Sequence, residues 1–192
     1  SSVPLSRDLR VVAKPIMMEL MRIAEENIYL TVLVENMVIA IDEVKSSHHL
    51  TLNPDVTYSY PIYACASGKI FLSALSEEKR SEVVSRLEYK KRAEATIVDG
   101  ETLLQEVEKT KERGYATEIM EFSDDLNSVA APIYDYRGQI VATISISGPA
   151  MRLTEERIAD LVDSLTETAS SISRRLGQGV EAGQEKKKTR NG

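Results

Sequence analysis

The chain has 192 residues, which is enough for one domain with a well-buried core and hardly enough for two. Its formal net charge is −6, and because the last sixteen residues carry four basic and two acidic side chains, residues 1–176 carry −8. Such a surface repels phosphate backbones, so this chain alone should not bind nucleic acid well. A single cysteine, Cys65, excludes an internal disulfide and fits a reducing compartment.

The sequence contains no uninterrupted apolar run near the ~18 residues that a membrane-spanning helix needs, and its start lacks the apolar core of a signal peptide. We therefore expect a cytoplasmic protein that does not contact a membrane. The segment 177–192 is polar and punctuated by glycines, which predicts a disordered tail. The predicted organisation is one domain over residues 1–176, followed by this tail.

The N-terminal third of the sequence is predicted to change from helix to strand. Apolar residues recur at helical spacing behind Pro15, which suits the first turn of a helix, so residues 15–26 should be helical. Two apolar, β-branched runs then flank a short polar pair and predict a hairpin over residues 28–45. A third strand is expected near residues 49–53, and two prolines within residues 53–62 predict a loop.

Helical patterns dominate the middle of the chain. Residues 66–75 and 76–87 are both predicted to be helices. A further helix is predicted over residues 101–114, because Asp99 can accept hydrogen bonds from its first free N–H groups and Gly114 can adopt the left-handed conformation that ends it.

Three strands follow in quick succession, over residues 115–122, 127–134 and 139–147. Strands clustered beside helices, rather than alternating with them, predict an α+β fold with a mainly antiparallel sheet. A final helix should begin at Thr154. Its apolar face is predicted to consist of Ile158, Leu161, Leu165, Ala169 and Ile172.

The strand over residues 140–149 presents two different faces, because successive side chains of a strand point to opposite sides. Its apolar face is predicted to be core, whereas three of the four side chains on the other face carry hydroxyl groups and none is charged. That second face suits neither packed core nor open water. The two sets are Ile140, Ala142, Ile144 and Ile146, and Val141, Thr143, Ser145 and Ser147.

The segment 66–70, Ala-Ser-Gly-Lys-Ile, is not a nucleotide-binding phosphate loop. That motif needs glycine where Tyr63 stands and serine or threonine where Ile70 stands. Ser67 and Gly68 do open a predicted helix, whose free N–H groups suit a small anion. The alternative, favoured by the local sequence, is that Ser67 is only a helix cap and Gly68 only a packing residue.

No other group of residues indicates catalysis or a metal. His48 and His49 are adjacent on a predicted strand, so they face opposite sides and cannot hold one metal ion. Cys65 has no histidine near it in sequence and is expected to be a buried structural thiol. Strand alternation sends Glu118 and Glu121 to opposite faces, which weakens an acid/base reading. We expect no enzyme, no metal and no cofactor.

The run from Gly114 to Pro149 resembles the effector-binding domain of the IclR family of bacterial transcriptional regulators. A second segment, Tyr60 to Leu75, is similar to that family's Pro-x-His-x-Thr-x-x-Gly-Lys pattern, although Tyr63 replaces the common histidine and Cys65 the common threonine. The resemblance covers about residues 5–176. In the first run Glu118 stands where aspartate or serine is usual, and the matching positions are Gly114, Glu121, Ser128, Val129, Ala130, Ile133, Tyr134 and Asp135.

This resemblance implies a GAF-like fold, in which helices pack on a curved antiparallel sheet and a pocket lies on its concave side. Hydroxyl and helix-start N–H groups that converge there would bind a carboxylate, so the implied effector is a small organic acid, a hydroxy- or keto-carboxylate. Carried over position by position, the effector-binding residues are Tyr63, Ala66, Ser67, Glu118, Leu126, Ser128, Ser145 and Ser147.

The resemblance also implies a homodimer or homotetramer, and contact with DNA only through an N-terminal winged helix-turn-helix that is expected to be absent from this chain. Effector binding would then change oligomer state and operator affinity. Two alternatives stay open: a small enzyme on a GAF-like scaffold, and a dimerisation module that binds no ligand.

Overall fold

The structure, a computed structural model, describes residues 3–48 and 59–188. It contains a six-stranded antiparallel sheet with the strand order β3-β2-β1-β6-β5-β4. Along the chain the elements are α1 (Val3–Ala24), β1 (Asn27–Val34), β2 (Met37–Val44), β3 (Ser59–Pro61), α2 (Ala66–Ser73), α3 (Glu77–Ser85), α4 (Gly100–Arg113), β4 (Ala116–Ile119), β5 (Leu126–Tyr134), β6 (Ile140–Pro149) and α5 (Glu155–Lys188).

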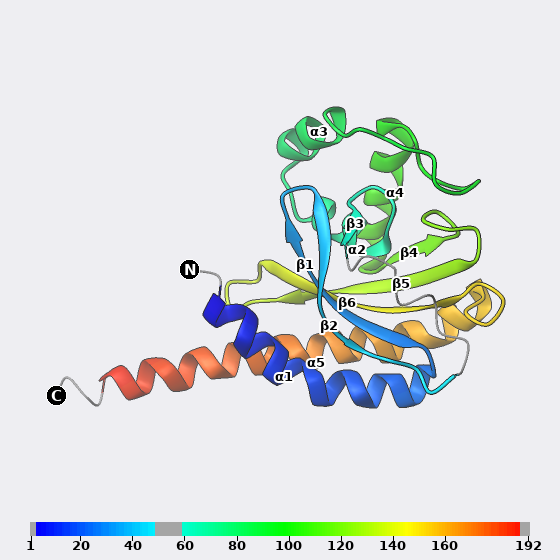
Figure 1. The fold of residues 1–192 in the computed structure, drawn as a ribbon. Coiled ribbons are helices and arrows are strands. Elements are labelled where there is room, and N and C mark those ends of the chain that lie inside the picture. Colours follow the sequence, from blue (N-terminus) through cyan, green and yellow to red (C-terminus); the bar gives the residue numbers. More distant parts are fainter. Residues whose placement is uncertain (1–2, 49–58, 189–192) are drawn as a thin grey trace.

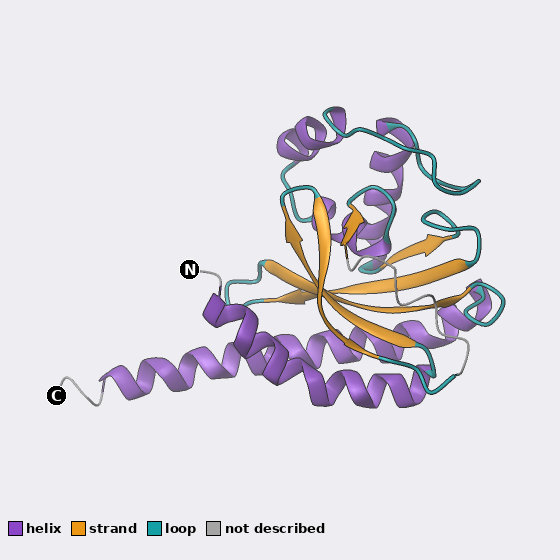
Figure 2. Ribbon diagram, viewed as in Figure 1, coloured by secondary structure: helices purple, strands orange, loops and turns teal. Residues whose placement is uncertain are grey.

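The sheet is strongly curled and is covered on both faces (Figure 1). Helices α1 and α5 lie side by side against one face, while α2, α3 and α4 gather on the other (Figure 2). Because β1 and β6 occupy the centre of the sheet, strands from the two ends of the chain are direct neighbours. This arrangement confirms the predicted α+β class and the curved antiparallel sheet of a GAF-like fold.

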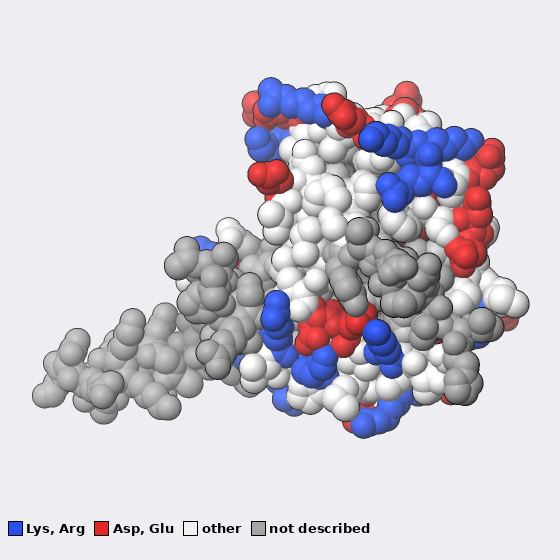
Figure 3. Space-filling view, viewed as in Figure 1, with Lys and Arg blue, Asp and Glu red and all other residues white. Residues whose placement is uncertain are grey.

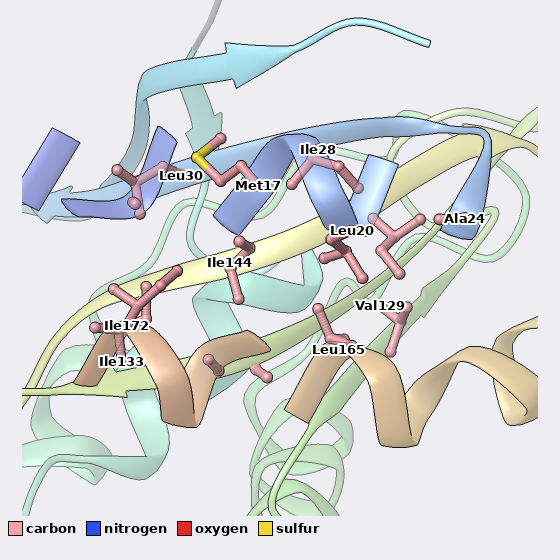
Figure 4. Packing of buried hydrophobic residues seen from close by; sticks show 14 of the residues in the cluster. Met17, Leu20, Ala24, Ile28, Leu30, Val129, Ile133, Ile144, Leu165 and Ile172 are labelled. Carbon is pink, nitrogen blue, oxygen red and sulfur yellow. The ribbon is translucent and has the colours of Figure 1, made fainter. Parts of the chain in front are cut away.

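The larger hydrophobic core fills the space between the sheet and the pair α1 and α5 (Figure 4). Met17 and Leu20 of α1 meet Ile28 of β1 and Ile144 of β6 there, all of them buried. Fully burying one such side chain stabilises a fold by roughly 1.5–3 kcal/mol. The predicted apolar face of α5 is confirmed, since Ile158, Leu161, Leu165, Ala169 and Ile172 all belong to this core.

A second core lies on the opposite side of the sheet, under α2, α3 and α4. It contains Ile62, which follows β3, Leu72 of α2, and Leu103 and Val107 of α4, all buried. As predicted, the Asp99 side chain caps α4 by accepting from the N–H of Thr102, and Gly114 ends the helix with φ of 81°. Because both faces of the sheet are covered, polar side chains on either face need partners in the protein, in ordered water or in a ligand.

The first helix is longer than predicted. It begins at Val3, so Pro15 lies in its interior and not in its first turn. A proline there removes one N–H···O=C bond, which leaves the carbonyl of Val11 without its helical donor. Both residues are exposed, so water can hydrate that carbonyl and the helix continues. The hairpin that follows is confirmed as β1 and β2.

Only part of the segment 46–62 belongs to the described residues. Within the predicted loop 53–62, residues 59–61 form the short strand β3, which pairs with β2. The third strand expected near residues 49–53 and one of the two histidines, His49, lie outside the described residues.

The helix α5 continues to Lys188. Helix therefore covers most of the segment 177–192, for which disorder is predicted, because no proline interrupts its Glu, Gln, Ala and Lys residues.

A β-bulge changes the side-chain pattern of β6. Ile133 of β5 pairs with Ala142, but the next residue, Tyr134, pairs with Ile140, so Val141 is the extra residue. Alternation therefore slips by one position. Ile140 packs with the clusters on the α2 side, and Val141 packs against the core beside α1 and α5. The predicted placement of these two residues was wrong, while that of residues 142–147 is confirmed.

Candidate functional site

A row of polar side chains crosses the sheet on the face that α2 covers. Ser147 of β6 pairs directly with Asn27 of β1 on one side and with Ser128 of β5 on the other, and Ser128 pairs with Glu118 of β4. Directly paired residues of an antiparallel sheet point to the same face. Four strands thus bring Asn27, Ser147, Ser128 and Glu118 into one line, which we call the polar row.

The serines of β6 lie at the centre of this face. Ser145 is buried and stands between Tyr29 of β1 and Ala130 of β5, and Ser147 is half-buried. Among the described residues neither serine hydroxyl has a hydrogen-bond partner within the protein. Two hydroxyls on a covered face are therefore left to bind something else.

The N-terminus of α2 meets the same face. Cys65 is the N-cap residue, and its side chain makes no capping hydrogen bond. Ser67 is buried inside the helix, and its hydroxyl lies 2.6 Å from that of Thr143 on β6. The alternative that Ser67 is only a helix cap is therefore wrong, because its side chain turns away from the helix terminus toward the sheet.

Gly68 is a packing residue, as the alternative reading of this segment proposed. A Cβ atom at this position would lie 1.8 Å from the carbonyl oxygen of Ile62. Only glycine therefore lets the start of α2 lie against the segment that follows β3. This contact holds the helix N-terminus over the polar face.

Three hydroxyl groups form a chain beneath α2. Thr143 lies between Thr31 of β1 and Ser67 of α2, with an oxygen-to-oxygen distance of 2.6 Å on each side. Each hydroxyl has a single proton to donate. If Thr31 donates to Thr143 and Thr143 donates to Ser67, the proton of the Ser67 hydroxyl is free to be donated to a ligand.

Glu118 accepts three hydrogen bonds from the protein. Its Oε1 accepts from the backbone N–H groups of Glu121 and Phe122, both at 3.0 Å, and its Oε2 accepts from the Ser128 hydroxyl at 2.9 Å. The expectation that Glu118 and Glu121 face apart was wrong. Strand β4 ends at Ile119, and Met120 takes a left-handed conformation with φ of 51°, which folds the chain back over Glu118.

Burial has a strong effect on the acidity of Glu118. The side chain is 1% exposed, and loss of hydration raises its pKa from 4.5 to about 7. The hydrogen bonds from Phe122 and Ser128 oppose this rise because they favour the charged form, and the nearby charge of Glu121 adds to it. Near neutral pH the carboxyl of Glu118 is therefore divided between its ionised and protonated forms.

A buried ion pair supports the turn after β4. The ammonium of Lys69, whose side chain is 1% exposed, donates to Glu121 Oε1 at 2.8 Å and to the carbonyl of Thr117 at 2.7 Å. Burial raises the pKa of Glu121, and the charge of Lys69 lowers it. Glu121 Oε2 is buried and has no partner among the described residues. The ammonium is thus directed at Glu121 and not at the polar row.

Five of the eight predicted site residues are polar and meet between the sheet and α2: Ser67 on the helix, and Glu118, Ser128, Ser145 and Ser147 on one face of the sheet. Leu126 lies two residues before Ser128 on β5 and so shares its face. Ala66 is buried in the small cluster between α2 and β5. Tyr63 is also buried, but its hydroxyl accepts from the N–H of Lys90 at 2.8 Å, and its ring packs on Tyr89. The hydroxyl of Tyr63 is therefore bonded within the protein.

Sequence reasoning missed the aromatic side of this site. The ring of Tyr60 packs edge-on against Phe122 at 5.1 Å. The N–H of Phe122 donates to Glu118, so Tyr60 lies near the end of the polar row. Burial, and then Tyr29, Cys65 and Glu118, raise the pKa of the Tyr60 phenol. The assignment of residues 53–62 to a loop hid this residue. Cys65 is buried, as predicted, and burial raises the pKa of its thiol to about 12.

The surface shows acidic and basic side chains next to one another on the face visible in Figure 3. Opposite charges interspersed in this way do not form the single-sign patch that nucleic acid attracts. Among the described residues, no helix combines the length and the apolar character needed to cross a membrane.

A family model described as "Bacterial transcriptional regulator IclR C-terminal" matches residues 2–174. The transcriptional regulator KdgR of Escherichia coli is 32% identical over 161 residues, which cover 84% of this chain and 61% of KdgR. The transcriptional repressor AllR of Escherichia coli is 33% identical over 172 residues, 90% of this chain and 64% of AllR. The chain thus spans about three fifths of these relatives.

Solved structures agree with the sequence comparison. The crystal structure of the Thermotoga maritima IclR matches with a TM-score of 0.83 and 32% identity, covering 92% of this chain and 72% of that one. An IclR homologue from Microbacterium hydrocarbonoxydans, crystallised with 4-hydroxybenzoate, matches with a TM-score of 0.78 and 26% identity, covering 89% and 69%.

The matching family model describes a regulatory domain, and KdgR and AllR are a transcriptional regulator and a transcriptional repressor. These comparisons support a regulatory domain and not a small enzyme on a GAF-like scaffold. The pattern recognised in the sequence, the curled sheet and the extent of the match all agree. The chain therefore belongs to the IclR family of bacterial transcriptional regulators, whose C-terminal domain it contains.

Proposed function

We propose that the chain senses a small organic acid, a hydroxy- or keto-carboxylate, which binds on the polar face between β6 and the N-terminus of α2. The observation that carries this proposal is the pair of serines at the centre of that face. Ser145 and Ser147 have no hydrogen-bond partner among the described residues, although α2 covers their side of the sheet. A ligand with several oxygen atoms would satisfy both.

The two ends of the site favour different parts of such a ligand. The carboxylate belongs near Ser67 and Ser145, because the N-terminus of α2 provides free N–H groups and the positive end of its dipole there. The second oxygen of the ligand, a hydroxyl or a keto group, belongs near Ser128 and Ser147. This orientation keeps the carboxylate away from the negative charge of Glu118.

Ala66, Leu126 and Tyr63 complete the proposed site as apolar contacts. The polar group of Tyr63 is bonded to Lys90, so only its ring is available. The Microbacterium homologue supports this class of ligand, since 4-hydroxybenzoate combines a carboxylate and a hydroxyl group. The many hydroxyls of this site favour a small, oxygen-rich acid over an aromatic ring.

In the whole regulator, we propose that binding of this acid shifts the population of a homodimer or homotetramer and so changes operator affinity. DNA would be bound by a winged helix-turn-helix domain of the complete protein, in the cytoplasm. The negative charge of residues 1–176 supports the assignment of DNA binding to another domain, because a negatively charged surface repels DNA.

A thermal-shift screen of small hydroxy and keto acids, followed by calorimetry of those that stabilise the chain, tests the proposal. An acid that binds the wild-type chain and loses affinity when Ser145 and Ser147 are replaced by alanine supports it. If no acid of this class stabilises the chain, the site does not serve this function and the dimerisation module is favoured. Light scattering with and without the acid then tests the coupling to oligomer state.

A further inference from the structure

The hydrogen bonds of Glu118 are unevenly divided between its two oxygens. Oε1 accepts two backbone N–H groups, whereas Oε2 accepts only the hydroxyl of Ser128. While Glu118 is ionised, the single proton of Ser128 is committed to Oε2. Ser128 then offers a ligand only its lone pairs, so it can accept a hydrogen bond but cannot donate one.

Protonation of Glu118 reverses this bond. The proton must go to Oε2, because the two N–H groups on Oε1 leave no acceptor for a proton carried there. The Glu118 hydroxyl then donates to the Ser128 oxygen across the same 2.9 Å contact. The proton of Ser128 is thereby released and can be donated to a ligand.

We infer that the Glu118–Ser128 pair determines which small acids the site accepts, through the direction of the hydrogen bond between them. This inference rests on the proposed function and concerns the second oxygen of the ligand. A keto oxygen can only accept a hydrogen bond, so it fits Ser128 only when Glu118 is protonated. A hydroxyl group can donate or accept, so it fits both states.

The groups around Glu118 allow its protonation, and with it the reversal of the hydrogen bond to Ser128, to take place near neutral pH. Burial of the carboxyl raises its pKa to about 7, and the carboxylate of Glu121 contributes to that rise. Lys69 of α2 is held by Glu121 and the Thr117 carbonyl, so it does not fix Glu118 in its ionised form. Tyr60 of β3 and Cys65 before α2 also face this group, and both stay neutral because burial raises their pKa values.

The affinities for keto acids and for hydroxy acids should depend on pH to different degrees, because only the keto acid requires protonated Glu118. Binding of a keto acid takes up a proton when Glu118 starts ionised, so its Kd should rise by up to about tenfold per pH unit above the pKa of Glu118. A hydroxy acid of the same size should show a much weaker dependence. Pyruvate and lactate are a matched pair of probes, because they differ only in the keto and hydroxyl group.

Calorimetry of both probes between about pH 6 and pH 8, in buffers of different ionisation enthalpy, measures affinity and proton uptake together. We expect pyruvate to take up close to one proton at the higher pH and lactate to take up a much smaller fraction. Equal proton uptake and equal pH dependence for the two probes would overturn the inference, while binding itself would leave the proposed function standing.

Glu118→Gln provides a fixed version of the protonated state. The amide oxygen must occupy the Oε1 position to accept the two N–H groups, so the NH2 group faces Ser128 and donates to it. Pyruvate affinity should then be independent of pH and resemble that of the wild-type chain at low pH. Retention of the wild-type pH dependence in this variant would contradict the inference.

Ser147→Ala is the matched control, because Ser147 belongs to the same polar row but is not bonded to Glu118. It should weaken both probes by a similar factor and leave the pH dependence of pyruvate binding unchanged. A measurement without ligand is also decisive. Carbon-13 NMR of glutamate carboxyls should show Glu118 titrating near neutral pH, and an ordinary glutamate pKa would sink the inference even if no acid binds.

Discussion

Glu26 and Arg152 form an ion pair with two hydrogen bonds, in which Nε and Nη2 of the arginine lie 2.8 and 2.9 Å from the two carboxylate oxygens. Glu26 immediately precedes β1, and Arg152 follows β6 in the connection to α5. The pair therefore ties together the ends of the two central strands. Gly148 lies directly beside it, and a Cβ atom there would be 2.6 Å from Glu26 Oε2.

Replacing Arg152 by alanine should lower the free energy of unfolding by about 1–2 kcal/mol, because Glu26 is buried and would lose both donors. Chemical denaturation measures this change. The exposed pair Arg174 and Glu167 is the control, and Arg174→Ala should cost no more than about 0.5 kcal/mol. Equal losses in the two variants would show that the Glu26 pair has no special role.

Gly68→Ala should destabilise the chain by about 1–3 kcal/mol or more, since its new methyl group would collide with the backbone carbonyl of Ile62. The start of α2 would have to move away from the sheet, so affinity for an acid should fall as well. Gly177→Ala is the comparison. Nothing lies within 4 Å of a Cβ atom there, so that helical position should gain about 0.5–1 kcal/mol.

Replacing Ser145 and Ser147 together by alanine should leave the fold nearly unchanged, because neither hydroxyl bonds to another described residue. Acid affinity should fall by about tenfold to a hundredfold for each charge-assisted hydrogen bond that is lost. Calorimetry and thermal unfolding of the same variant separate the two effects. Unfolding of the chain, with unchanged affinity in the folded fraction, would mean that the serines are structural.

The stability of the chain should fall as pH rises through the window between about 4.5 and 7. Folding raises the pKa of Glu118, so the folded state holds its proton more tightly than the unfolded state does. The stabilisation is complete below the unfolded pKa and is lost as pH passes the folded one. The Glu118→Gln variant does not lose this stabilisation. Its unfolding free energy relative to that of the wild-type chain should therefore increase by about 1–3 kcal/mol between the lower and the upper end of this pH window. A pH-independent difference between the two chains in chemical denaturation would contradict this.

Features that depend on a few neighbouring residues were predicted well from the sequence. Asp99 and Gly114 mark the ends of α4 through local capping, and the apolar spacing from Ile158 to Ile172 defines the buried face of α5. The two faces of residues 142–147 follow from strand alternation alone. Ser145 and Ser147 were singled out because uncharged hydroxyls on one face of an otherwise apolar strand are unusual, whereas Ser128 and Glu118 were indicated only by the family resemblance and Asn27 was not predicted.

Features that depend on distant parts of the chain were not predictable in this way. The bulge at Val141 arises from pairing with β5, and the left-handed Met120 reverses a chain that alternation would carry straight on. Both changed the side to which a predicted residue points. Tyr60 was missed because β3 is three residues long and exists only by pairing with β2.

The central position of β6 also sets the order in which the site can form during synthesis. Thr31 and Thr143, which bond to each other, are 112 residues apart in the sequence. Until the ribosome has released β6, the inner edge of β1 has no strand to pair with, and Ser67 lacks its hydroxyl partner. Nascent chains stopped before residue 140 should therefore expose an unpaired strand edge and depend on chaperones, and the candidate site is complete only when the last strand is in place.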